Sequence, residues 1–296
     1  VNILGTTIEQ SGGAITAGTL VAKASSAGPG AVGILLPQTN HVGLAALTSA
    51  VLNGTITLIS DQPLTVGDGN SGFTGTVSGV TSADGAINLA GAGVLLNDVV
   101  NAGTAAVDIA GSGGITGAAT VTGTDVTLTS GPDGGIGSLV TPVNVDASTS
   151  LSLATTGAAS AGDIHVNISG ITNLSDLTLA TDATTGQQVE LRGLTTLDAT
   201  LSAPLDSLTF VGTGGALTVT AAGQITAGNI ALIADTLNIA GTLNAPTGTI
   251  AIAPLTVEHA LAVTGLPAGS TAALFQFGDA NTGAITLSGT LDLTGS

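Results

Sequence analysis

Apolar and small polar residues alternate in short runs along most of this chain, and many runs begin at a glycine. The recurring phrase is Gly, a small residue, Ile, a further small residue and then, in most copies, an aliphatic one. Its copies are Gly13-Ala14-Ile15-Thr16, Gly54-Thr55-Ile56-Thr57-Leu58, Gly85-Ala86-Ile87-Asn88-Leu89, Gly248-Thr249-Ile250-Ala251-Ile252 and Gly283-Ala284-Ile285-Thr286-Leu287. A period of two places alternate side chains on one face of a strand. Each copy therefore predicts a turn followed by a short strand with one buried face.

The phrase returns at irregular intervals of about 20 residues, which is typical of a β-solenoid whose coils stack on one another. Near the C-terminus, Ile230-Ala231-Leu232 matches Ile250-Ala251-Ile252. Likewise, Leu237-Asn238-Ile239 matches Leu255-Thr256-Val257. These matches predict an all-β fold with coils of about 18–20 residues, and hence an elongated rod of roughly 15 coils.

We expect residues 1–296 to form a single continuous solenoid segment. The chain does not begin with Met and neither end resembles a capping coil, so we expect the segment to be a piece of a longer chain. The stretch 131–146 is rich in Gly and Pro, and it is the best candidate for a loop that protrudes from the coils.

Composition supports a narrow aliphatic core. The chain holds 45 Gly and four Phe, with no Cys, Met, Trp or Tyr, whereas a wide globular core normally uses aromatic side chains to fill its volume. Hydrophobic residues make up 43% and the mean hydropathy is +0.59, which excludes a disordered polar chain. No apolar stretch approaches the roughly 20 residues of a membrane-spanning helix, so we expect no insertion into a membrane.

The charge balance restricts the partners. The formal net charge is −17, and Lys23 and Arg192 are the two basic residues. Nucleic-acid binding needs many Lys and Arg side chains to neutralise phosphates, so we expect no nucleic-acid partner. Binding to anionic lipid surfaces is disfavoured for the same reason. The absence of Cys fits an extracellular protein that relies on repetition instead of disulfides.

Few residues carry candidate chemistry. His41, His165 and His259 lie far apart, with no paired metal-ligand spacing. Asp68 and Asn70 flank Gly69 in a turn cluster, and their oxygen atoms make them the candidate ligands for Ca²⁺. We expect no other cofactor and no catalytic residues.

An enzyme acting on polysaccharide is the third hypothesis for function. Glycoside hydrolysis needs two carboxylates about 5–10 Å apart, and stacked coils could supply the pair Asp163 and Asp182 or the pair Asp125 and Asp146. Such enzymes also use aromatic side chains to bind sugars and cationic groups to stabilise developing anions. A chain without Trp or Tyr and with only two basic residues offers little of either, so we expect no enzymatic activity.

Three phrases resemble the repeat region of filamentous-haemagglutinin-like large exoproteins. They are Ile8-Glu9-Gln10 with Gly13-Ala14-Ile15-Thr16-Ala17-Gly18-Thr19-Leu20, Asn40-His41-Val42-Gly43-Leu44-Ala45-Ala46-Leu47, and Asp61-Gln62-Pro63-Leu64-Thr65-Val66. The resemblance implies a right-handed parallel β-helix, two-partner secretion by a Gram-negative bacterium and an adhesive or filament-forming role at the cell surface.

The leading expectation is therefore a structural stalk of an extracellular adhesin. Its partners would be a host or neighbouring-cell surface or the extracellular matrix, with end-to-end or lateral self-association. The alternative is a self-assembling fibre subunit whose open ends stack into a polymer.

Overall fold

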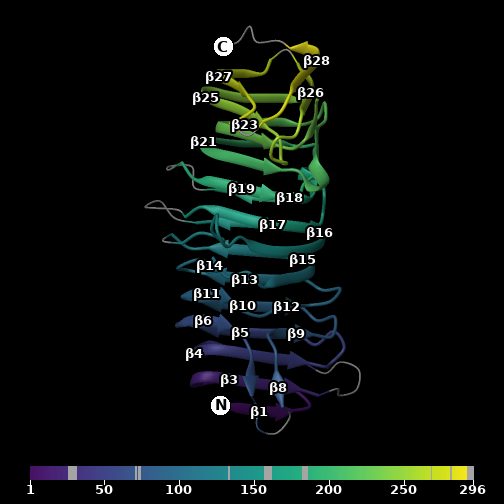
Figure 1. The fold of residues 1–296 in the computed structure, drawn as a ribbon. Coiled ribbons are helices and arrows are strands. Elements are labelled where there is room, and N and C mark those ends of the chain that lie inside the picture. Colours follow the sequence, from purple (N-terminus) through teal and green to yellow (C-terminus); the bar gives the residue numbers. More distant parts are fainter. Residues whose placement is uncertain are drawn as a thin grey trace. The chain divides into compact units, whose positions relative to one another are not determined.

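The computed structural model confirms the predicted all-β, parallel solenoid fold, with about 11 turns of stacked coils (Figure 1). It describes residues 1–25, 32–70, 72, 75–132, 134–156, 162–181, 186–267, 269–280 and 282–291. The chain divides into two compact units, an N-terminal unit (Val1–Gly162) and a C-terminal unit (Asp163–Ser296). The helical segments in these ranges are two short 3₁₀ turns, and none is long and apolar enough to cross a membrane.

The N-terminal unit is built from short strands. Their bounds are β1 (Asn2–Gly5), β2 (Ile8–Glu9), β3 (Thr16–Ala24), β4 (Ile34–Ser49), β5 (Ile56–Ser60), β6 (Pro63–Val66), β7 (Gly69–Asn70), β8 (Thr76–Val77), β9 (Val80–Ser82), β10 (Ile87–Gly91), β11 (Gly93–Leu96), β12 (Val100–Asn101), β13 (Val107–Gly111), β14 (Ile115–Thr116), β15 (Thr120–Ser130) and β16 (Val143–Thr155).

Three parallel ladders connect the successive coils of this unit. One runs through β5, β10, β13, β15 and β16, a second through β6, β11 and β14, and a third through β9, β12, β15 and β16. Ile56 lies beside Ile87, and Leu58 lies beside Leu89. The copies of the phrase at 54–58 and 85–89 are thus stacked in register.

The glycine of the phrase also has a packing role. A Cβ atom on Gly85 would lie 2.2 Å from the carbonyl oxygen of Gly54 in the neighbouring coil. No side chain fits at that separation, so glycine allows the two turns to approach closely.

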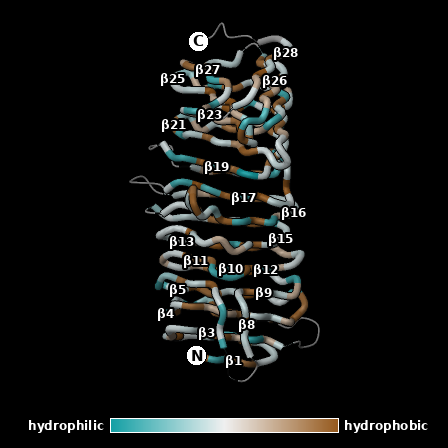
Figure 2. Tube along the Cα trace, in the orientation of Figure 1, coloured by the Kyte–Doolittle hydropathy of each residue, from teal (hydrophilic) through white to brown (hydrophobic). Residues whose placement is uncertain are grey.

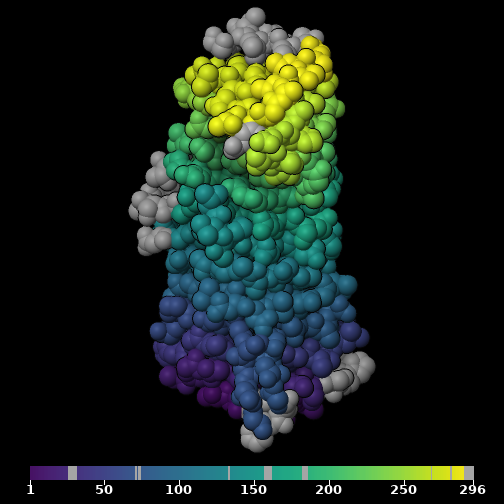
Figure 3. Space-filling model, in the orientation of Figure 1, coloured from purple at the N-terminus to yellow at the C-terminus, as the bar shows by residue number. Residues whose placement is uncertain are grey.

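One strand pair departs from the parallel pattern. Strands β7 and β8 form an antiparallel hairpin, with Gly69 opposite Val77. Val77 packs with Val21 of β3 and Ala46 of β4, so the hairpin covers the outer surface of the first coils. Figure 3 shows the hairpin in blue across the purple coils.

The C-terminal unit has the same construction. Its elements are β17 (Ile164–Gly170), η1 (Leu174–Asp176), β18 (Leu177–Ala180), β19 (Gln188–Arg192), β20 (Thr196–Leu197), β21 (Thr200–Val211), η2 (Thr213–Gly215), β22 (Ala216–Val219), β23 (Gln224–Ile233), β24 (Thr236–Ile239), β25 (Thr242–Ala253), β26 (Leu261–Leu266), β27 (Thr271–Phe277) and β28 (Ile285–Leu291). One ladder passes through β17, β19, β21, β23, β25 and β27, and another through β20, β22, β24, β26 and β28.

The long strands of this unit turn a corner at the same place in each coil. The register shifts between Ala203 and Ser207 in β21, and the later strands β23, β25 and β27 shift at matching positions. At this corner a Cβ atom on Gly248 would lie 1.7 Å from the Gly228 carbonyl oxygen. The bend is therefore shared by all four strands and depends on small residues.

Both units bury aliphatic side chains between the ladders. Leu58, Ile87 and Leu128 are 2% exposed or less, as are Leu232 and Ile250 in the C-terminal unit. The alternation of apolar and polar positions can be followed along the strands in Figure 2. Burying one such side chain stabilises the fold by about 1.5–3 kcal/mol, so the interior ladders are the main source of stability.

Several coils are longer than expected, because loops and the β7/β8 hairpin are inserted between strands. For example, 31 positions separate Thr57 from Asn88 in adjacent coils. Longer coils explain why about 11 turns are present where the sequence predicted roughly 15.

The second of the two C-terminal matches was wrong. Ile230 does lie beside Ile250, but Leu237 lies beside Val263. Leu255 and Val257 are exposed in the connection between β25 and β26. An insertion of one irregular segment displaced the true partner beyond the expected interval.

The stretch 131–146 contains both loop and ordered pairing. Ile136 is buried and forms a bridge to Ile115, and the residues from Val143 onward belong to β16. Between them, Leu139 and Val140 are exposed.

The prediction of a single continuous solenoid segment stays a prediction, as do the rod shape and the right-handed winding.

Candidate functional site

The three phrases that resemble large exoproteins meet at one corner of the N-terminal unit. Asn40 is fully buried there. Its side-chain oxygen accepts hydrogen bonds from Gln10 Nε2 and from the backbone N–H of Ile15, both at 2.8 Å. Its Nδ2 donates to the carbonyl oxygens of Gln38 (2.7 Å) and Ile59 (3.2 Å). One amide thus joins backbone groups of three coils.

Ser60 continues this network into the third phrase. Its hydroxyl accepts a hydrogen bond from Val42 N and donates one to Val42 O, at 3.1 and 3.0 Å. It also accepts from Gln62 N at 3.2 Å. The polar residues at this corner therefore close backbone hydrogen bonds where the strands bend.

His41 and Asp61 form an exposed pair at the same corner, with 2.6 Å between Nδ1 and the Asp61 carboxylate. Hydrogen bonds from Gln62 and His41 hold the pKa of Asp61 below its usual value. The pair is exposed, so it contributes little to stability.

Asp68 and Asn70, the calcium candidates, lie at the start of the β7/β8 hairpin. Asn70 Oδ1 accepts a hydrogen bond from Gly72 N at 2.9 Å, which is a turn-closing contact. Asp68 is hydrogen bonded to Asp98, which lowers the pKa of Asp68 and raises that of Asp98. The two carboxyl groups therefore lie within hydrogen-bonding distance of each other at the start of the hairpin. Calcium binding by Asp68 and Asn70 stays a prediction, and Asp98 is a carboxylate that the sequence reasoning did not associate with them.

The carboxylate pairs considered for glycoside chemistry have other neighbours. Asp125 lies beside Ser150, whose hydroxyl donates to it at 2.6 Å, whereas Asp146 lies beside Thr122. Asp163 accepts a hydrogen bond from Gln188 N at 2.8 Å. Asp182 lies outside the described residues.

The histidines remain separate in the described ranges, where no group of three or more His, Asp or Glu residues has the arrangement of a metal site. His165 is 5% exposed and lies beside Glu190, with 3.8 Å between Nδ1 and Oε2. Arg192 forms an ion pair with the same carboxylate. His259 lies near Asp235, and it joins Thr256 in lowering the pKa of Asp235 against the opposing effect of partial burial.

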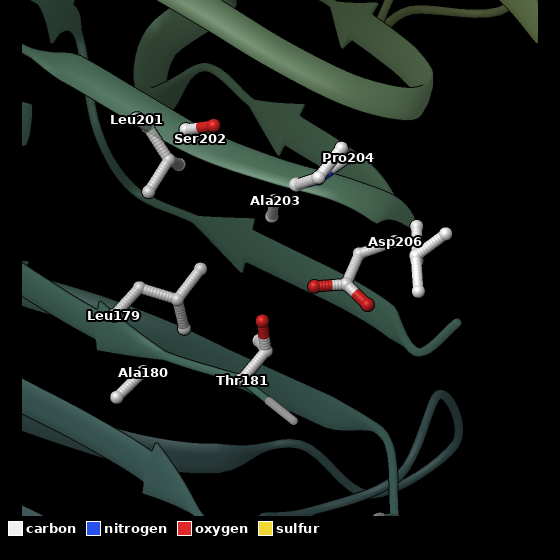
Figure 4. Close-up of a pocket in the computed structure, with 9 residues that line it drawn as sticks. Leu179, Ala180, Thr181, Leu201, Ser202, Ala203, Pro204 and Asp206 are labelled. Atoms are coloured by element: carbon white, nitrogen blue, oxygen red, sulfur yellow. The ribbon is translucent and has the colours of Figure 1, made fainter. Parts of the chain in front are cut away.

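A cavity of about 190 Å³ lies between β18 and β21 in the C-terminal unit (Figure 4). Its lining combines apolar side chains with a few polar groups: Leu179, Ala180, Thr181, Leu201, Ser202, Ala203, Pro204, Leu205 and Asp206. Asp206 is 1% exposed, and its Oδ1 accepts a hydrogen bond from Gln187 N at 2.9 Å. Figure 4 shows the Asp206 carboxylate and the Thr181 hydroxyl directed into the same space, with Leu179 and Leu201 beside them.

Sequence reasoning missed Asp206, Glu190 and Asp98. In the sequence they are isolated acidic residues in a chain with 19 of them, so composition gives no reason to choose these three. One signal was present for Asp206, because it follows Pro204 and Leu205 inside an otherwise alternating strand. A proline and a break of period mark the bulge that turns Asp206 inward.

Comparison with known proteins does not assign the chain to a family. No protein-family model, no curated protein and no solved structure matches the chain. What is established for this protein is accordingly a β-solenoid repeat architecture.

Proposed function

We propose that this chain is a structural stalk segment of a filamentous-haemagglutinin-like adhesin, exported by a Gram-negative bacterium and exposed at the cell surface. The observation that carries the proposal is the register of the coils. Aliphatic residues stack on aliphatic residues in successive turns, as Ile56, Ile87 and Val107 do in one ladder. Stacked coils of this kind resist unfolding and carry binding surfaces without a wide core.

The outward positions support the same role. Polar side chains connect coils across the surface, as where Asp84 accepts hydrogen bonds from Thr104 N (2.9 Å) and Oγ1 (3.0 Å). Asp235 forms the equivalent pair of contacts with Thr256, both at 2.8 Å. The recurrence of this carboxylate–threonine contact in both units suits a surface that must stay ordered when exposed.

The corner at Asn40 supports the relationship to large exoproteins. The three phrases that carry the resemblance are neighbours in space, and their polar residues belong to one hydrogen-bond network. A shared structural cause explains why the phrases occur together in one chain.

The modular architecture can be tested with two deletions. Removal of residues 87–106 takes out one coil and places Val107 on Ile56, so we expect the variant to keep its β circular dichroism and a cooperative melt. Removal of residues 87–96 deletes half a coil and turns the remaining ladders out of register, so we expect it to lose both. Equal tolerance of the two deletions would contradict the role of stacked coils.

The adhesive role is tested on cells that produce the parent protein. Antibodies against the chain should label intact cells, and deletion of the chain from the parent gene should reduce attachment to host cells or matrix. Labelling confined to permeabilised cells, or unchanged attachment, would contradict the proposal. Electron microscopy that showed indefinite fibres of the purified chain would favour the fibre-subunit alternative instead.

A further inference from the structure

The cavity between β18 and β21 has a chemical character that a structural stalk does not require. Asp206 is 1% exposed and lines the cavity. Its Oδ1 accepts a hydrogen bond from Gln187 N, but its Oδ2 accepts no hydrogen bond from the residues that the structure describes. Burial of a carboxylate without full compensation is costly, so an unpartnered oxygen facing a cavity points to a ligand that supplies the missing donors.

No positive charge among the described lining residues offsets this carboxylate. Of the two basic residues in the chain, Arg192 forms an ion pair with Glu190, and Lys23 belongs to the N-terminal unit. A cation bound beside Asp206 would therefore have to come from another molecule.

We propose that this cavity binds a primary ammonium group carried on a short aliphatic stem. The ammonium group donates to Asp206 Oδ2 and to the Thr181 hydroxyl, which are directed into the same space in Figure 4. The methylene stem packs on Leu179, Leu201 and Ala203. An ammonium group has three donors and no acceptor, which suits a site whose side chains offer acceptor oxygens.

Other ligand classes fit the lining less well. An anion would be repelled by Asp206. Ca²⁺ takes six to eight oxygen ligands, whereas the lining side chains that the structure describes offer one carboxylate and two hydroxyl groups. Sugars are commonly held by stacking on aromatic rings, and the described lining has none.

The proposal goes beyond the stalk function and does not depend on it. The ammonium group has two natural sources, a free alkylamine and a lysine side chain of a partner protein. Both carry the same group on a methylene stem, so the test includes one probe for each source.

Calorimetric titration of the full chain with n-butylammonium tests the proposal directly. We expect one site per chain, and no saturable binding of 1-butanol, which has the same stem without the charge. Asp206→Asn keeps an acceptor for Gln187 N but removes the charge, and should weaken binding at least about tenfold. Thr181→Val removes one acceptor and should weaken it by about two- to tenfold.

Asp163→Asn is the matched control. It makes the same change of net charge, and Asp163 also accepts a backbone hydrogen bond, from Gln188 N at 2.8 Å, but Asp163 is exposed and does not line the cavity. We expect its affinity to stay within twofold of the parent chain. Equal loss in Asp163→Asn and Asp206→Asn would overturn the proposal, because it would indicate attraction to net negative charge alone.

Titration with Nα-acetyl-lysine N-methylamide distinguishes the two sources. Binding of both probes supports capture of lysine side chains, and binding of butylammonium alone supports a free amine as ligand. Binding of neither probe overturns the proposal. If Asp206→Asn fails to fold by circular dichroism, the comparison of butylammonium with butanol and the Thr181→Val variant decide the outcome.

Discussion

The N-terminal and C-terminal units bury different kinds of polar side chain. Among the residues that the structure describes, the buried polar side chains of the N-terminal unit are neutral, and they are Asn40, Ser49, Ser60, Ser130 and Thr155. In the described part of the C-terminal unit three ionisable side chains are buried, His165, Glu190 and Asp206, together with Gln187 and Ser270. Each unit by itself has parallel ladders and an aliphatic interior, so this difference is not a requirement of the fold.

The buried polar side chains fall into two kinds, those that complete backbone hydrogen bonds and those that have an oxygen without a described partner. A buried amide or hydroxyl costs little when it completes backbone hydrogen bonds at a bend, as Asn40 and Ser60 do. A buried carboxylate is expensive unless it is paired, and Asp206 has one oxygen without a described partner. The described buried carboxylate that carries the proposed ammonium site therefore belongs to the C-terminal unit.

The largest expected effect concerns the aromatic residue in the interior of the C-terminal unit. Phe210 is fully buried, so Phe210→Ala should leave a cavity and lower the free energy of unfolding by about 3–5 kcal/mol. Urea unfolding followed by circular dichroism measures the loss, and hydrogen exchange should place it in the C-terminal unit. Leu128→Ala is the N-terminal counterpart, with an expected loss of about 2–5 kcal/mol. A loss below about 1 kcal/mol for Phe210→Ala would mean that the aliphatic ladders alone set stability.

The corner at Asn40 comes next. Asn40→Ala removes the acceptor of Ile15 N and the donor to Gln38 O and Ile59 O, and each group left unsatisfied costs about 1–3 kcal/mol. We expect a clear drop in the urea midpoint with an unchanged slope. Asn88→Ala is the control, because Asn88 is exposed and makes one long contact, and its effect should stay within about 0.5 kcal/mol. Similar losses for the two variants would contradict a structural role for the buried amide.

The stacked corner of the C-terminal unit predicts an intermediate effect. Gly248→Ala forces a methyl group against the Gly228 carbonyl oxygen, and overpacking of this kind costs about 1–3 kcal/mol. Gly18→Ala is the control in the N-terminal unit, because nothing lies within 4 Å of its Cβ position and its backbone is not left-handed. We expect thermal unfolding to separate the two variants. Equal melting temperatures would mean that the corner of β23 and β25 accommodates the added methyl group without loss of stability.

The smallest effects concern the carboxyl groups at the surface of the N-terminal unit, where pH dependence gives the test. The pKa of Asp98 is raised by its hydrogen bond with Asp68 and by partial burial, so its contribution to stability is present at low pH and lost as the pH rises through the raised pKa. Asp98→Asn keeps a neutral partner for Asp68 at every pH. We expect it to raise the melting temperature at pH 7 and to leave it unchanged at pH 3. A lower melting temperature at pH 7 would contradict a raised pKa of Asp98.

Asp84→Asn is a control for which we expect the opposite dependence of stability on pH. Hydrogen bonds from Thr104 lower the pKa of Asp84, so its contribution is present above the unfolded pKa near 3.8 and is lost as the pH falls through the lowered value. The substitution should lower the melting temperature at pH 7 and have no effect at strongly acidic pH.

Addition of Ca²⁺ to the parent chain at pH 7 tests the calcium prediction at Asp68 and Asn70. A rise in melting temperature that Asp68→Asn abolishes would support calcium binding at this site. No rise would contradict it.

Much of the fold could be predicted because it follows from local pattern. The period of two, the glycine at each turn and the stacking of Ile56 on Ile87 all result from short-range geometry and one repeated unit. The pairing of Leu237 failed because the partner lies beyond an irregular connection, and nothing in the local pattern measures the length of a loop. The candidate site was not predicted, because apart from the break of period at Pro204 and Leu205 nothing in the sequence separates Asp206 from the other acidic residues.

The fold class, the aliphatic interior and the polar exterior follow from the amino-acid sequence, since each depends on the alternation of neighbouring residues. Contacts between coils set which acidic residues are buried, which carboxyl groups are hydrogen bonded to each other and where a cavity opens. These depend on contacts between coils about 20 to 30 positions apart. Burial and pairing arise from that distant packing, and they turn one aspartate among many into a candidate binding group.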